Sequence, residues 1–130
     1  MLDTCNTDFL AQALGPKWDK KLFVNAELTP TDLTNTPTMN LYKAILKKYG
    51  KAVSGGVGSF SQMGFTEAEI VVHALRTIKG PYTVQSVNAA IKAVSNFNTG
   101  MLCQLWTYGG YPMHIPNNED YTVTPHKARW

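Results

Sequence analysis

The feature that most constrains the fold is a long helical pattern in the middle of the chain. Apolar residues recur at helical spacing across residues 60–79, and Gly80-Pro81 follows them directly. Glycine is common just after a helix, and proline cannot continue one, so this pair marks a helix end. The pattern predicts a long amphipathic helix whose apolar stripe consists of Phe60, Met63, Ile70, Ala74 and Ile78.

Three shorter helices are predicted around it. Residues 38–49 carry a second apolar stripe, which ends at Gly50. Thr83 caps a further helix with apolar positions at i, i+3, i+4 and i+7, namely Val87, Ala90, Ile91 and Val94. A short first helix is expected before Gly15-Pro16, with N-cap candidates at Thr4, Asn6 and Thr7.

Three segments have the residue pattern of β-strands: 21–28, 101–108 and 121–126. The stretch TPTDLTNTPT (29–38) is rich in threonine and proline and predicts a crossing segment or surface linker. The order of elements predicts an α/β fold with helices packed on a small sheet, as a single domain over residues 1–130. Three strands are few for four helices, so some helical faces are expected to meet a partner.

Composition argues against several kinds of partner. The chain is 44% hydrophobic and 16% charged, which is typical of a globular domain rather than of disorder. The net charge is +3, and the basic cluster of Lys43, Lys47, Lys48 and Lys51 lacks the interleaved aromatic residues of a nucleic-acid-binding face. A solvent-exposed helix face explains this cluster better, and no nucleic-acid partner is expected.

The N-terminus and the hydropathy pattern bear on location. No segment reaches the length of a membrane span, so the chain is not expected to be embedded in a membrane. The first residues, MLDTCNTDFLAQAL, lack the basic and continuous apolar regions of a signal peptide. As written, the chain is expected to be cytoplasmic.

No residue pattern indicates catalysis, a metal site or a cofactor. Cys5 and Cys103 lack the spacing of zinc ligands and are expected to be half-buried thiols, with a disulfide between them as the alternative. Glu67 and Glu69 are two residues apart and point to different sides of a helix. His73 is expected to be a surface or hydrogen-bonded histidine rather than a base. We therefore expect a protein that is not an enzyme and binds no metal.

Candidate binding residues lie where a glycine-rich loop meets the long helix. The loop GGVGSF (55–60) follows a helix and lacks the third glycine of a dinucleotide fingerprint, so it predicts positive φ angles rather than nucleotide binding. The unpaired N–H groups at the start of the next helix can hold a carboxylate. Phe60 and Gln62 at this point are as consistent with ligand binding as with packing.

Aromatic side chains in the surrounding elements could line a pocket for an organic ligand, because they combine contact area with polar handles. They are Phe60, Phe65, Trp106, Tyr108 and Tyr111. For Phe65 and Trp106, packing in the core is the favoured interpretation.

Four phrases in the sequence carry a family resemblance. LFVNAELTP (22–30) has the form of a strand leading to a proline-containing crossover, and YKAILKKYG (42–50) of the helix after it. GFTEAEIVVHAL (64–75) and FNTG (97–100) follow, before a predicted hairpin. In order and spacing they resemble the C-terminal third of the type I periplasmic solute-binding proteins of ABC transporters, in the branched-chain amino acid and amide receptor family.

The resemblance implies a partial periplasmic-binding-protein-like type I fold and non-covalent binding of an amino acid, amide or aromatic acid. The implied ligand-binding residues are Ser59, Phe60 and Gln62 at the start of the long helix, and Asn25 and Glu27 near the crossover. The first lobe of the family has no counterpart here, so these residues would form one wall of a site. The implied partner of the full-length parent is the ABC transporter permease, and that parent would be periplasmic.

A truncated receptor would expose apolar surface that the first lobe covers. Self-association is the simplest way to bury such surface, so a homo-oligomer is expected, with exchange of the long helix or the terminal hairpin as one route. The alternative to a receptor is a stand-alone intracellular interaction or regulatory module that kept the fold but not transport. The absence of a signal peptide favours this alternative.

Overall fold

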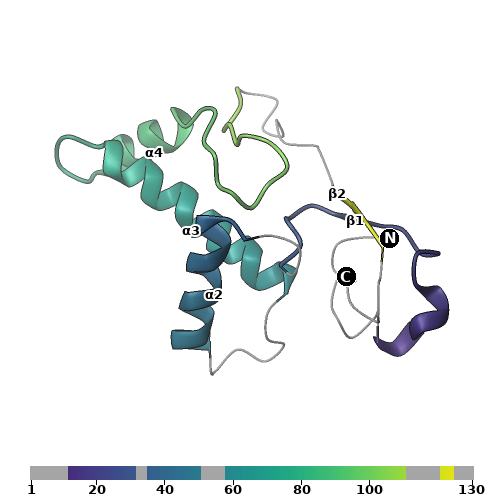
Figure 1. The fold of residues 1–130 in the computed structure, drawn as a ribbon. Coiled ribbons are helices and arrows are strands. Elements are labelled where there is room, and N and C mark those ends of the chain that lie inside the picture. Colours follow the sequence, from purple (N-terminus) through teal and green to yellow (C-terminus); the bar gives the residue numbers. More distant parts are fainter. Residues whose placement is uncertain (1–11, 32–34, 51–57, 111–120, 125–130) are drawn as a thin grey trace.

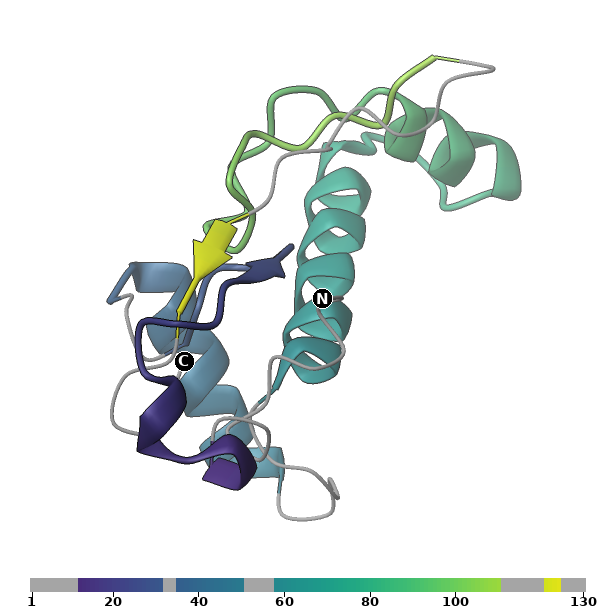
Figure 2. The same cartoon turned by 90° about the vertical axis from the view of Figure 1, so that its right-hand side faces the viewer.

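The structure, a computed structural model, describes residues 12–31, 35–50, 58–110 and 121–124 (Figure 1). The fold is mixed, with much helix and few strands. Its elements are the 3₁₀ helix η2 (Pro16–Trp18), β1 (Val24–Ala26), α2 (Pro37–Tyr49), α3 (Ser59–Thr77), α4 (Val84–Lys92) and β2 (Tyr121–Val123). Helix α3 runs through the middle, with α2 beside its first half and α4 at its C-terminal end (Figures 1 and 2).

Helix α3 confirms the long helix expected from the sequence, but its buried face differs from the predicted stripe. Ile70 and Ala74 are buried, whereas Phe60 is 71% exposed and Met63 is exposed as well. The first half of the buried face consists instead of Ser59, Gln62 and Thr66. The apolar stripe was wrong there because these polar side chains are accommodated in the interior; the Thr66 hydroxyl, for example, donates to the Gln62 carbonyl at 2.8 Å.

Helices α2 and α4 are confirmed; α2 begins one residue before the expected 38, and α4 ends at Lys92, before Val94. The Thr36 side chain accepts a hydrogen bond from the Met39 N–H, and proline occupies the first helical position after it. In α4 the Thr83 hydroxyl accepts from the Ser86 N–H, and the Ser86 hydroxyl accepts in return from the Thr83 N–H. Both helices are therefore positioned by local sequence.

Two of the three predicted strands contribute to a sheet. Strands β1 and β2 pair antiparallel, with Val24 opposite Val123 and Ala26 opposite Tyr121. The strand predicted over 101–108 is wrong: Leu102 forms a single bridge with Leu28, and Trp106 forms one with Phe97. These two pairings join different segments, so no continuous ladder can form along this part of the chain. The terminal hairpin expected from the sequence is therefore wrong as well, because β2 pairs with β1 instead of with residues 101–108.

Among the described residues, two clusters of buried side chains lie near the two ends of α3. The first contains Leu28, Met39, Tyr42 and Met101, with Phe65 packed against it. The second contains Ala74, Ala90 and Val94, with Trp106 packed against it. The core role favoured for Phe65 and Trp106 is thus confirmed.

Several sequence-based expectations lie wholly or partly outside the described residues. These are the N-terminal part of the first helix with Cys5, the glycine-rich segment before Gly58, Tyr111, and residues 125–126 of the third strand. Residues 12–14 are helical, and the helix ends before Gly15, whose φ of 73° is favourable for glycine. Of the helices in the described ranges, none has the combination of length and hydropathy needed to cross a membrane.

Candidate functional site

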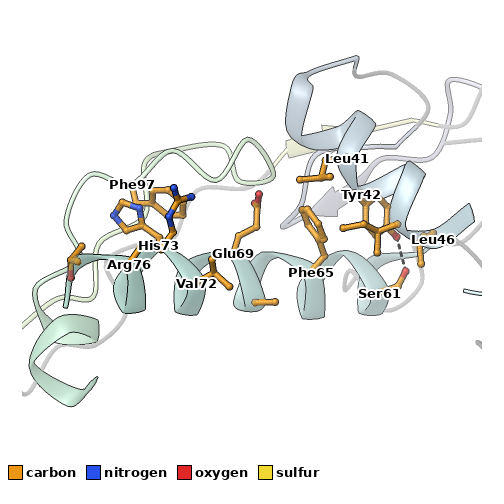
Figure 3. Close-up of a pocket in the computed structure, with 13 residues that line it drawn as sticks. Leu41, Tyr42, Leu46, Ser61, Phe65, Glu69, Val72, His73, Arg76 and Phe97 are labelled. Carbon is orange, nitrogen blue, oxygen red and sulfur yellow. Dashed lines mark hydrogen bonds between the residues drawn. The ribbon is translucent and has the colours of Figure 1, made fainter. Parts of the chain in front are cut away.

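A groove of about 790 Å³ runs along α3, between α2 and the segment that carries Phe97 (Figure 3). Its volume falls within the range of small-molecule pockets in proteins. Helix α3 contributes side chains spaced three or four residues apart, which places them on one face of the helix. They include Ser61, Phe65, Glu69, His73 and Arg76.

The wall nearest α2 is apolar. Leu41 is 50% exposed, and Ile45 on the next turn of α2 is exposed too. Phe65 faces them from α3 and packs against the ring of Tyr42, with ring centroids 5.4 Å apart. Large apolar side chains with this much exposure offer contact area to a ligand or a partner.

The opposite end of the groove carries charge. Glu69, His73 and Arg76 are spaced i, i+4 and i+7, so they follow one another along the same face (Figure 3). The His73 ring stacks on Phe97, with centroids 4.0 Å apart and 21° between the ring planes. The stacking holds the imidazole against the groove wall, while the Arg76 side chain is exposed.

The Glu69 carboxyl is the unusual polar group of the groove. Its Oε2 is buried and accepts no hydrogen bond from any residue in the described part of the chain. Burial raises the pKa of this carboxyl above its usual value of 4.5, because the charged form is poorly solvated. A carboxyl with an unused acceptor favours a ligand that brings an N–H or ammonium donor.

A hydrogen-bonded group closes the groove at the start of α3. The Tyr42 hydroxyl lies 2.6 Å from Ser61 Oγ, and Ser61 Oγ donates to the Gly58 carbonyl at 2.8 Å. Burial raises the pKa of Tyr42, and its hydrogen bonds to Ser61 and Gly58 oppose this only in part. The phenol therefore stays neutral at ordinary pH and ties α2 to the first turn of α3.

Of the residues predicted to bind ligand, Ser59 and Gln62 lie together on the buried face of α3. Gln62 Nε2 donates to the Thr29 carbonyl at 2.8 Å, so this side chain joins α3 to the segment after β1. Phe60, between them in sequence, is directed to solvent. The helix start thus does not present all three side chains to one ligand.

Asn25 and Glu27 are exposed, because they alternate along the strand with buried Val24, Ala26 and Leu28. They share one side of this segment but do not line the groove, and neither do Ser59, Phe60 and Gln62. Their part in binding stays a prediction. In the sequence Glu69 was compared with Glu67, and His73 follows it by four residues; the signal that was missed is the continuation of this spacing to Arg76 at i+7.

The described residues offer no centre for metal-based chemistry. Among them, His, Cys, Asp and Glu form no group of three or more that could hold a metal ion. Cys103 is half-buried, and whether it meets Cys5 is a question that lies outside the described residues. The groove offers apolar contacts, one acceptor and one cationic group to a bound molecule.

Comparison of the chain with protein-family models, with curated proteins and with solved structures gives no match. The functional argument therefore rests on the groove and on the residue pattern.

Proposed function

We propose that this chain binds a small organic ligand without catalysis, as the ligand-recognising part of a solute receptor of an ABC importer. The observation that carries this proposal is the groove itself: an apolar cavity of about 790 Å³ that contains the unused acceptor of Glu69. Apolar walls with a few placed polar groups are typical of small-molecule sites.

The side chains of the groove favour one ligand chemistry. An apolar or aromatic body would lie against Leu41, Ile45 and Phe65. An amino or amide N–H would donate to Glu69, and a ligand carboxylate could pair with the guanidinium of Arg76. An amino acid, an amide and an aromatic acid each use part of this set, in line with the ligand class that the family resemblance implies.

The proposal that this chain is part of a solute receptor is based on the order of the four sequence segments that resemble the receptor family. YKAILKKYG (42–50) and GFTEAEIVVHAL (64–75) fall on α2 and α3 in the expected order, and α4 follows them but ends at Lys92, before FNTG (97–100). A partial type I binding-protein fold is part of the proposal, and so are the ABC transporter permease as partner of the full-length receptor and the periplasm as its compartment.

A second candidate is a stand-alone interaction module. It is favoured by large apolar side chains that are exposed outside the groove, among them Phe60 and Phe23 at 63%. Such side chains are more typical of a surface that meets another macromolecule than of a closed ligand site. This module would require no small ligand.

The test is a thermal-shift screen of the full chain with amino acids, amides and aromatic acids, followed by calorimetry with any ligand that raises Tm. We expect one class to raise Tm, and Glu69→Gln to weaken its binding about tenfold or more through loss of a charge-assisted hydrogen bond. Glu67→Gln is the matched control, since Glu67 is exposed on the same helix and does not line the groove. No shift with any class, or equal binding by the two variants, would overturn this assignment of the groove.

A further inference from the structure

The charged end of the groove is complementary to itself. Glu69 and Arg76 lie on one face of α3, about two turns apart, with Val72 and His73 between them. Among the described residues Glu69 Oε2 has no hydrogen-bond partner, and the Arg76 side chain is exposed. In a two-fold symmetric interface, residue i of one copy contacts residue j of the other, and j contacts i. Opposite charges at equal distances from a midpoint meet this condition, because the negative charge of each copy then lies opposite the positive charge of the other.

We infer that a second copy of this chain docks on this face, with the two α3 helices antiparallel across a two-fold axis beside Val72 and His73. Antiparallel helices about that midpoint place Glu69 of each copy opposite Arg76 of the other. Two equivalent ion pairs form, and the half-buried position of Glu69 makes each stronger than a pair in open solvent. Val72, which is 53% exposed, becomes buried at the centre.

The apolar surfaces match in the same arrangement. The antiparallel direction brings the α3–α4 connection of one copy towards the Leu41, Ile45 and Phe65 wall of the other. That connection carries Tyr82, and Val84 follows as the first residue of α4; they are 69% and 73% exposed. Helix α4 packs on α3 through Ala74, which does not line the groove, so α4 leaves this face accessible.

A second copy accounts for the charges better than an unrelated partner does. An unrelated partner needs a separate acidic and basic pair at matching spacing, whereas the copy supplies both from the same two residues. The arrangement uses a surface that is already exposed, so it does not require exchange of α3 between copies. The copy and the proposed ligand use the same Glu69 and Arg76, so they would compete for this face, and the dimer is therefore tested on the protein without ligand.

Charge reversal provides the first test, by sedimentation velocity of the full chain across a range of concentrations. We expect the wild type to dimerise, and Glu69→Arg and Arg76→Glu each to raise the dimer Kd about tenfold or more through like-charge repulsion. An equimolar mixture of these two variants should associate again, because one face is then wholly positive and the other wholly negative. Glu67→Arg, on another face of α3, should dimerise like the wild type.

Cysteine cross-linking keeps the test valid if a reversed charge prevents folding. Val72→Cys should give a disulfide-linked dimer on mild oxidation, because the axis passes beside residue 72. Val71→Cys is the matched control: it is 41% exposed but lies outside the groove, and it should cross-link no more than the wild type. A monomeric wild type, folded charge variants that dimerise unchanged, a folded mixture that stays monomeric, or equal cross-linking at 71 and 72 would each overturn the inference.

Discussion

Gln62 joins three segments that are far apart in the sequence. Its Nε2 donates to the Thr29 carbonyl, while the Thr29 N–H and hydroxyl donate to the Met101 carbonyl at 2.8 and 3.1 Å. The side chain therefore positions α3 against both the segment after β1 and the segment that contains Met101. A ligand-binding role at this position would have to coexist with this structural one.

Replacing Gln62 distinguishes its structural role from the predicted ligand-binding role. We expect Gln62→Leu to lower the free energy of unfolding by about 1–3 kcal/mol, because the buried Thr29 carbonyl loses its side-chain donor. Urea unfolding measures the change, and Gln85→Leu on the exposed side of α4 should cost far less. A Gln62→Leu protein with wild-type stability but lost ligand binding would show that the residue acts on the ligand instead.

Glu69 should make stability depend on pH. Its folded-state pKa is raised above the unfolded value, so the native state holds the proton more tightly and stability falls as pH rises from about 4.5 through the raised pKa. Glu69→Gln should therefore be more stable than the wild type at pH 7, by less than about 1 kcal/mol because the group is partly exposed, with a smaller difference at pH 4. Thermal unfolding at both pH values, at protein concentrations low enough to keep the chain monomeric and with Glu67→Gln as control, measures this. An equal difference at both pH values would contradict the assignment.

At the scale of the elements, α2 is held by a close contact at its N-terminus. Gly100 has a φ of +65°, and a Cβ built there would lie 2.7 Å from Thr38 Oγ1 on the first turn of α2. The absence of a side chain at residue 100 allows the chain before Met101 to approach this turn. Asn98 supports the turn, since its Oδ1 accepts from the Gly100 N–H at 2.9 Å.

A pair of glycine substitutions tests this approach. We expect Gly100→Ala to destabilise the protein by about 1–3 kcal/mol, from the positive φ and the clash with Thr38. Gly64→Ala should instead stabilise by about 0.5–1 kcal/mol, because residue 64 lies within α3 with no neighbouring atom within 4 Å of its Cβ position. Chemical denaturation of both variants gives the comparison. Opposite signs support the close approach, and a neutral Gly100→Ala would count against it.

The helices could be predicted from sequence because their ends are encoded locally. Thr36 and Thr83 cap α2 and α4, and Gly50 and Gly80-Pro81 mark where α2 and α3 end. The pairing of residues 101–108 could not be predicted, because Leu102 pairs with the distant Leu28 whereas Trp106 pairs with Phe97 just before this segment. The buried polar face of α3 could not be predicted either, because the Gln62 side chain finds its hydrogen-bond acceptor in the Thr29 carbonyl, 33 residues away.

At the level of the whole molecule, the groove too could be predicted from the sequence only in part. The residues that α3 contributes to the groove are regularly spaced in the sequence, from Phe65 through Glu69 and His73 to Arg76. Its other walls, Leu41 and Phe97, come from segments whose placement depends on tertiary packing. The sequence could therefore indicate that these residues share one face of α3, but not that a groove would form along this face.

The two core clusters lie near opposite ends of α3, so we expect them to open separately. Met101→Ala should lower the stability of the first cluster by about 2–5 kcal/mol, because Met101 is fully buried. Hydrogen exchange in α4 should change little, since α4 packs in the second cluster. Val94→Ala should show the converse pattern. Equal changes in α2 and α4 for both variants would show that the clusters unfold as one unit.

The length of helix α3 can convert a small rotation at one end into a larger displacement at the other. It has 19 residues and is therefore about 28 Å long, and α2 lies beside only its first half (Figure 2). A rotation of about 5° between α2 and α3 would move the α4 end by about 2.5 Å over that length. Segment 97–101 links the second cluster to the first and would absorb the displacement near Gly100. A small change in how far α2 and α3 are spread apart would thus become a much larger movement at the far end of the molecule.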